Sequence, residues 1–315
     1  MLLAYGPSPA RAQSGSADEA ALFLLLPVGA QAVAMGRTMI AMPSPESAFW
    51  NPAGLAGIEQ GQLVVYRGDE AVGEITALSA LAPAAGLGVF GLSYELLDGG
   101  EIDETDRQGN VTGRISERNH VVTGSLGTPL LPWLDIGANL KLILIRLSCT
   151  GQCPNGSVSA TGWAVDVGAQ ARPLGGVPLR VGAMVAHVGP DLQVVNADQA
   201  DPLPSRLRLS VAYDVLDRFA RDEPISLWLA AEYEDRLREP GEGRIYHLAA
   251  ELVAGDTDQI VLRAGYQEGD VGQADGFAVG VGIRFERFDV HLAKNLAGTL
   301  TGETEPVQVS FGVRF

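Results

Sequence analysis

The sequence is poor in positive charge and has no long apolar run. It carries 22 Lys and Arg against 38 Asp and Glu, which gives a net charge of −16 at pH 7. A nucleic-acid-binding protein needs a basic surface, so this class is excluded. A helix that crosses a membrane needs about 18 consecutive apolar residues. The most apolar stretch, residues 20–34, is interrupted by Pro27, Gly29 and Gln31, so we expect no membrane-spanning helix.

Residues that carry chemistry are also scarce. The sequence lacks the motifs of serine hydrolases, of helical zinc proteases and of phosphate-binding loops. Its four histidines, His120, His187, His247 and His291, are far apart along the chain. We therefore expect no enzyme, no metal site and no cofactor.

Only two cysteines are present, Cys149 and Cys153, in the segment SCTGQCPNGS. A zinc site would need further ligands, and no histidine lies nearby in the sequence. The glycines and the proline of this segment indicate a loop tip, where the two thiols are predicted to form a small disulfide. A disulfide implies an oxidising compartment. Two free thiols are the alternative.

What the chain does contain is glycine and short apolar segments. It has 39 glycines and 46% hydrophobic residues, with a mean hydropathy of +0.13. Such apolarity without long runs is typical of many alternating strands, either in a soluble all-β protein or in a transmembrane β-barrel. From residue 62 onward the apolar period is two, for example over 135–145, 206–215 and 307–315. Each such segment has one apolar and one polar face.

Three features favour the membrane barrel over a soluble sandwich. The segments are about 10–13 residues long, which suits tilted strands that cross a bilayer. Their polar faces carry ionisable residues, as a barrel lumen does, including Lys141, Asp166, Arg206, Arg208 and Glu234. Aromatic residues stand near strand ends, where they would meet the membrane interface. The fold class predicted is an all-β, antiparallel transmembrane barrel.

About fourteen strands are predicted, an even number as bacterial barrels require. They lie near 62–68, 72–82, 86–97, 115–127, 133–147, 159–172, 177–188, 205–216, 225–235, 244–254, 258–267, 275–285, 287–295 and 306–315. Long connections such as 98–114, 148–158 and 189–204 alternate with tight turns, the asymmetry expected between outer and periplasmic rims. The first long loop is acidic, which indicates a solvated surface. The chain ends on Phe315, which resembles the terminal aromatic signal of outer-membrane barrels.

The N-terminal sixty residues do not follow the strand pattern. Residues 1–12 end in Ala-Arg-Ala, which is similar to a signal-peptidase site, so they are interpreted as a signal-peptide remnant. An ordinary unstructured N-terminus is the alternative. Residues 13–60 are assigned to a separate N-terminal segment and residues 61–315 to the barrel. The Asn-Pro-Ala-Gly at 51–54 predicts a tight turn.

This N-terminal segment resembles PorV/PorQ-type outer-membrane proteins, which are related to the long-chain fatty-acid transporter (FadL) family. The family pattern is a GAR-A-x-x-MGGA stretch followed by WNPAGLA. In this chain Gly29-Ala30-Gln31-Ala32, Met35-Gly36 and residues 50–55 match it. Gln31 stands where arginine is usual, and Arg37 replaces a usual small residue.

The resemblance implies that residues 13–60 fill the lumen as a plug or hatch. Five residues are then candidates for binding a ligand at the plug: Met35, Met39, Trp50, Asn51 and Pro52. The alternatives are that the methionines pack the plug against the wall, and that Asn51-Pro52 is merely the turn into the first strand. A barrel of this width needs filling, and irregular backbone at membrane depth is tolerated inside protein.

Two functions follow from the resemblance. The first is a surface protein-binding or secretion-associated component of the bacterial outer membrane, whose partners are secreted or surface proteins. The second is a FadL-like channel for uptake or export of hydrophobic small molecules, with an apolar pocket between plug and wall and a lateral exit. Both place the chain as a multi-pass protein in contact with outer-membrane lipid.

Overall fold

The computed structural model describes residues 19–70, 72–152, 156–173, 176–193, 200–220, 222–268, 276–296 and 307–315. The proposed signal remnant at 1–12 and Cys153 lie outside these ranges. Among the described residues, no helix combines the length and the apolarity needed to cross a membrane.

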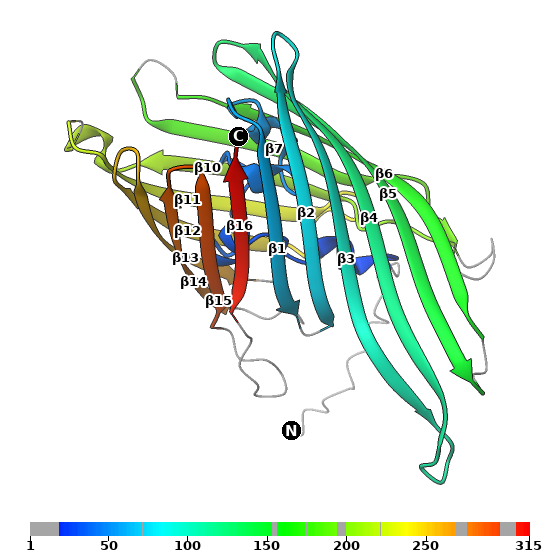
Figure 1. Cartoon of the computed structure of the whole chain (residues 1–315). Helices are drawn as coiled ribbons and strands as arrows, with labels where there is room; N and C mark the ends of the chain where they lie inside the picture. The colour runs from blue at the N-terminus through cyan, green and yellow to red at the C-terminus, as the bar shows by residue number, and fades with distance from the viewer. Residues whose placement is uncertain are drawn as a thin grey trace, which may run out of the picture.

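Within the described residues, fourteen antiparallel strands form one closed barrel, with β1 hydrogen-bonded to β16 (Figure 1). The strands are β1 (Gln62–Glu70), β2 (Gly73–Ala84), β3 (Gly88–Thr105), β4 (Val111–Leu131), β5 (Leu134–Gly151), β6 (Val158–Ala171), β7 (Leu179–Val188), β10 (Arg206–Asp214), β11 (Ile225–Arg236), β12 (Ile245–Ala254), β13 (Gln259–Glu268), β14 (Gly276–Phe285), β15 (Phe288–Asn295) and β16 (Gln308–Arg314). A separate two-stranded sheet, β8 (Leu192–Gln193) with β9 (Ala200–Asp201), lies between β7 and β10 in the chain. The predicted fold class and strand number are confirmed.

The alternation of apolar and polar residues along each strand determines which side chains face outward and which face the lumen. In β10, Leu209 and Val211 are exposed on the outer face, whereas Arg206, Arg208 and Ser210 are buried on the inner face. The same division holds along β5 and β16. Successive side chains of a strand point to opposite faces. One strand can therefore present apolar side chains to the bilayer and polar side chains to the lumen.

The connection 98–114, predicted as a long loop, is largely strand, so this part of the prediction is wrong. In the connection 148–158, β5 continues to Gly151 and β6 begins at Val158. β3 has 18 residues, β4 has 21 and β5 has 18, against the about 9–11 needed to cross a bilayer. The β3–β4 hairpin projects beyond the rest of the barrel (Figure 1). Its acidic residues pair across the strands with arginines, as Asp103 does with Arg114 at 3.1 Å. Charge pairing in solvent replaces apolar alternation there, which is why the pattern suggested a loop.

The segment before β1 lies inside the barrel. It contains η1 (Leu22–Leu25), α1 (Ala30–Ala34), η2 (Pro45–Ala48) and η3 (Pro52–Leu55), drawn in blue in Figure 1. These short helices pack on inward-facing residues from both sides of the wall, from β4, β5 and β6 to β13, β14 and β15. The core of the molecule is therefore the interface between this segment and the wall.

We call residues 29–57 the plug body and residues 19–28 the outer arm. The two parts meet different regions of the wall. The plug body forms an apolar cluster with Ala212, Ala230 and Ala249, whereas the outer arm packs through Phe23 and Leu26 on an apolar wall formed by β1 to β6.

Candidate functional site in the barrel lumen

The plug body is fitted to the wall at inward-facing glycines. A Cβ on Gly137 or Gly127 would overlap with the backbone of Pro52, and a Cβ on Gly265 would overlap with the backbone of Gly36. A Cβ on Gly182 of β7 would likewise overlap with the carbonyl of Ile40. Glycine at these wall positions permits backbone-to-backbone approach, and this fixes the plug body on two sides.

Asn51 holds the turn that the sequence predicted. It is fully buried, and its Oδ1 accepts from the Ala53 amide at 3.1 Å to cap η3. Its Nδ2 donates to the Ile40 carbonyl at 2.8 Å and to the Ala169 carbonyl of β6 at 3.2 Å. One side chain thus joins two parts of the plug body to the wall. Pro52, at the first position of η3, supplies a backbone angle suited to a helix start.

The other candidate residues also lie at the plug. Met35 and Met39 are fully buried in the cluster of the plug body with the wall alanines. The Trp50 indole donates to the Val28 carbonyl at 2.9 Å, and the Arg208 guanidinium lies over its ring at 4.7 Å. Trp50 lines a cavity between the plug and the wall. Ligand binding by the set stays a prediction.

Glu46 is a buried plug residue at the wall that the sequence analysis missed. Its carboxylate accepts from the amides of Gln31 and Ala32 at 3.3 and 3.1 Å, at the start of α1, and from the Ser310 hydroxyl of β16 at 2.8 Å. Burial raises the pKa of the Glu46 carboxyl, while the bonds from Ser310 and the two amides act to lower it. A Cβ on Gly29 would overlap with this carboxylate, so the glycine and the acid belong to one contact. The acidic residue four positions before Trp50 in a Pro-rich stretch was the available signal.

A cavity of about 50 Å³ lies between the outer arm, the plug body and the wall. Its apolar side includes Leu24, Leu26, Val28, Phe49 and Val121. Its polar side includes Arg37, Glu95, Lys141, His187, Arg206, Arg208 and Glu234. This volume holds a few water molecules at most, so this cavity is too small for a solute of the size of a hydrocarbon in this structure.

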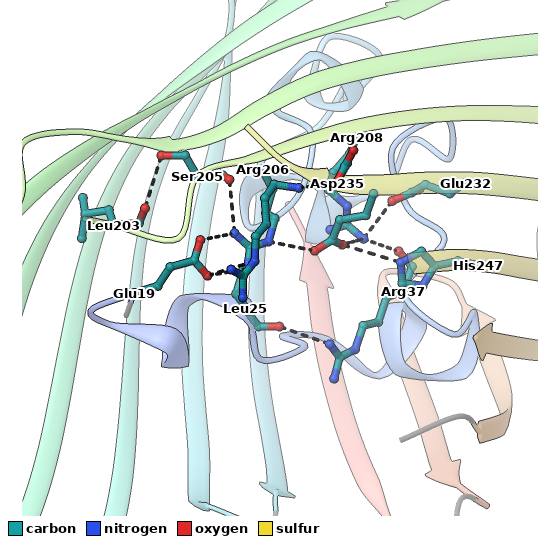
Figure 2. A network of polar contacts seen from close by, with 12 residues as sticks. Glu19, Leu25, Arg37, Leu203, Ser205, Arg206, Arg208, Glu232, Asp235 and His247 are labelled. Carbon is teal, nitrogen blue, oxygen red and sulfur yellow. Dashed lines mark hydrogen bonds and ion pairs between the residues drawn. The ribbon is translucent and has the colours of Figure 1, made fainter. Parts of the chain in front are cut away.

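Ion pairs line the polar side of the lumen (Figure 2). Arg206 binds both carboxylate oxygens of Glu19 at 2.8 Å, which ties the outer arm to β10. Arg208 contacts Glu232 at 2.8 Å and Glu234 at 3.2 Å, and His247 lies 3.6 Å from Glu234. These side chains come from alternate positions of β10, β11 and β12, as the sequence predicted. Paired charges of both signs keep this wall polar without a strong net field.

The barrel wall is irregular between β6 and β7. Their register shifts between Val165 and Val167, and His187 adopts a positive φ of 58° at the end of β7. Lys141 and Asp166 are ion-paired beside it at 2.7 Å, and the His187 amide donates to Asp166 at 2.8 Å. Beyond Val188 the chain leaves the barrel sheet, and Leu192 and Leu203 turn into the apolar cluster under the outer arm.

A second cavity, of about 670 Å³, lies at the end of the barrel that has the tight turns. It is lined by plug residues that include Glu46 and Gln60, and by Arg284, Asp289 and Arg314 of the wall. Asp289 lies 3.3 Å from Arg314 and 3.7 Å from Arg284. This vestibule is polar, in contrast to the apolar side of the first cavity.

Cys149, near the end of β5, is disulfide-bonded. Its predicted partner, Cys153, lies outside the described residues, so the placement of the pair at a loop tip stays a prediction.

Comparisons with known proteins identify the fold. No family model matches the chain, and no curated protein matches its sequence. Among solved structures, the toluene transporter TodX of Pseudomonas putida is similar with a TM-score of 0.60 at 14% identity, over 91% of this chain and 96% of TodX. The CymD monoaromatic hydrocarbon channel has a TM-score of 0.58 at 13% identity, over 91% of this chain and 97% of CymD. A FadL homologue of Pseudomonas aeruginosa has a TM-score of 0.56 at 14% identity, over 91% of this chain and 96% of its own.

The likeness extends over nearly the whole of each chain and includes the segment that precedes the strands. At this identity it shows the fold alone. Bacterial barrels have short turns on the periplasmic side and longer loops on the outside, which assigns the tight-turn end of this barrel to the periplasm and the long-hairpin end to the cell exterior. The chain is therefore a bacterial outer-membrane protein, a fourteen-stranded β-barrel structurally similar to the FadL and TodX channels.

Proposed function

We propose that this protein is an outer-membrane channel for hydrophobic small molecules. The observation that carries the proposal is the apolar wall of β1 to β6 in the outer half of the lumen, which the outer arm covers. This wall includes Ile75, Leu97, Val121 and Ile143. A water-filled pore is lined by polar residues. An apolar wall inside a barrel instead suits an apolar solute, which would bind it when the outer arm moves away.

The irregular wall between β6 and β7 supports a lateral exit. In the described residues, β7 pairs with β6 only from Val188 down to Val181, so the outer part of β6 has no partner from β7. Leu192 and Leu203 cover this region from within. A solute leaving there would enter the membrane without crossing the polar vestibule at the periplasmic end.

Uptake of a radiolabelled aromatic hydrocarbon into proteoliposomes tests the channel. We expect Val121→Gln to lower uptake, because it puts an amide on the apolar side of the first cavity. Val64→Gln is the matched control, since Val64 lines the periplasmic vestibule instead. Equal uptake by wild-type protein and empty vesicles would overturn the proposal.

The secretion-associated role, of PorV/PorQ type, is the second candidate. One observation favours it: the β3–β4 hairpin extends beyond the barrel and carries the exposed apolar side chains of Ile102 and Val111. Extraction from native membrane in mild detergent, followed by mass spectrometry, separates the two candidates. A stoichiometric surface protein that is lost on Ile102→Asp would favour secretion, and a bound apolar molecule would favour the channel.

A further inference from the structure

Arg37 occupies a position where the backbone favours glycine. Its φ is 68°, in the left-handed region, directly after Gly36 with φ 54°. An L residue with a branched or long side chain is disfavoured there. A costly arginine at a site that suits glycine indicates that the side chain itself is needed.

The contacts of Arg37 join three parts of the molecule (Figure 2). Its amide donates to the Ala32 carbonyl at 2.8 Å and ends α1. Its carbonyl accepts from Arg208 of β10 at 3.1 Å. Its guanidinium Nη1 donates to the Leu25 carbonyl at 3.3 Å, at the end of η1. The side chain therefore crosses from the plug body to the outer arm, and it lines the first cavity.

The outer arm is tied to the rest of the protein at its two ends and at its middle. At its start are the Glu19 pair with Arg206 and the Ala20 amide bond to the Pro202 carbonyl at 2.9 Å. At its end, beside the plug body, the Tyr66 hydroxyl donates to the Pro27 carbonyl at 3.5 Å and the Trp50 indole to the Val28 carbonyl at 2.9 Å. The Arg37 bond to Leu25 is the tie at the middle. The plug body is fixed by Asn51, by Glu46 and by the wall glycines. Loss of the Arg37 bond would remove the tie at the middle of the arm, and local opening is favoured where such ties are lost.

We propose that Arg37 is the gating residue of this channel. It closes the first cavity by tying the outer arm to the plug body, and substrate enters when the arm releases this tie. The inference rests on the proposed channel function for its purpose. Arm release itself is measured without any substrate.

The test is thiol accessibility under the arm. In a variant with Cys149 and Cys153 changed to alanine, Val121→Cys places a thiol on the wall that the arm covers. Adding Arg37→Gly removes the side chain, and glycine readily adopts the positive φ of this position. We expect labelling by a small hydrophilic thiol reagent to become about tenfold faster, the effect of losing one hydrogen bond from a charged donor. Arg37→Asn, which tolerates the same φ, gives the same result and guards against a folding defect.

Two controls make the result specific. Ala249→Cys lies under the plug body, and its labelling should not change with Arg37→Gly. Glu286→Gly, at another non-glycine position with positive φ (49°), should leave labelling of Val121→Cys unchanged. Unchanged labelling of Val121→Cys in both Arg37 variants, or equal exposure of Ala249→Cys, would overturn the gate. Faster labelling without hydrocarbon uptake by any variant would instead reject the channel function and retain the gate.

Discussion

The fit between Gly168 and Asn51 gives a quantitative prediction. Gly168 of β6 faces Asn51 so closely that a Cβ would overlap with Oδ1 and lie 2.9 Å from Cγ. The next atom is Pro52 Cδ at 3.5 Å, an ordinary contact. Gly168→Ala must therefore displace the Asn51 side chain. In an Asn51→Ala background the new methyl group would have no side-chain atom to displace.

The magnitude follows from the bonds of Asn51. It makes three hydrogen bonds, to Ala53, Ile40 and Ala169, at 3.1, 2.8 and 3.2 Å. The Ile40 carbonyl keeps a second donor, the Gln170 amide at 3.2 Å. At about 1 kcal/mol for each bond, Asn51→Ala should weaken the seating of the plug by about 2–4 kcal/mol. Gly168→Ala should cost a similar amount, and the double variant no more than Asn51→Ala alone. The coupling energy is then about 2–4 kcal/mol.

The assay is protection of a buried thiol between plug and wall. Ala212→Cys, in the cluster of the plug body, reports plug release in the cysteine-free background. When reclosing is faster than labelling, the ratio of the unprotected to the observed rate gives the free energy of opening. All four members of the cycle are measured with the same reagent.

Two results would refute the reasoning. If Gly168→Ala is harmless in the wild-type background, the wall accommodates a methyl group and the close fit is not a constraint. If the loss of plug-opening free energy in the double variant equals the sum of the losses in the two single variants, the glycine acts through β6 itself and not through Asn51.

Three further predictions concern other parts of the plug and the outer surface. Because burial raises the Glu46 pKa in the folded protein, plug stability should increase as the pH falls through that raised value toward 4.5 and decrease as it rises. Thermal unfolding against pH should lose this dependence in Glu46→Gln. Glu19→Ala should release the outer arm by about 1–3 kcal/mol, read as faster labelling of Val121→Cys, since it removes a bidentate pair with Arg206. Cys149 and Cys153 should react with a membrane-impermeant thiol reagent on intact cells only after reduction, and labelling without reduction would contradict the disulfide.

The barrel could be predicted because its constraint is periodic. Along β5, β10 and β16 every second residue meets lipid, and this leaves a signal that survives at any sequence identity. The same alternation correctly placed Arg206, Arg208 and other ionisable residues in the lumen. Strand ends beyond the bilayer lack this constraint, so the extended β3–β4 hairpin was mistaken for a loop.

The plug could be predicted only as a segment, because its structure depends on long-range contacts. Glu46 is held to the wall by a hydrogen bond from Ser310, which lies 264 positions away in the sequence. The bond between Arg37 and Leu25 spans twelve positions, but nothing local distinguishes it from a surface arginine. The wall glycines likewise look like ordinary strand glycines until the plug backbone is placed against them.

The lumen has two faces, and this constrains what the proposed channel would carry. In its outer half, β1 to β6 present aliphatic side chains, while β10 to β12 present paired arginines and carboxylates. The first cavity lies on the seam between them, with Leu24 and Val28 on one side and Arg206 on the other. A wholly apolar solute would use one face and leave the other to water. A solute with a polar end would satisfy both, because its apolar part would replace the arm against the wall. Uptake compared between a hydrocarbon and its hydroxylated analogue would therefore show which face governs selection.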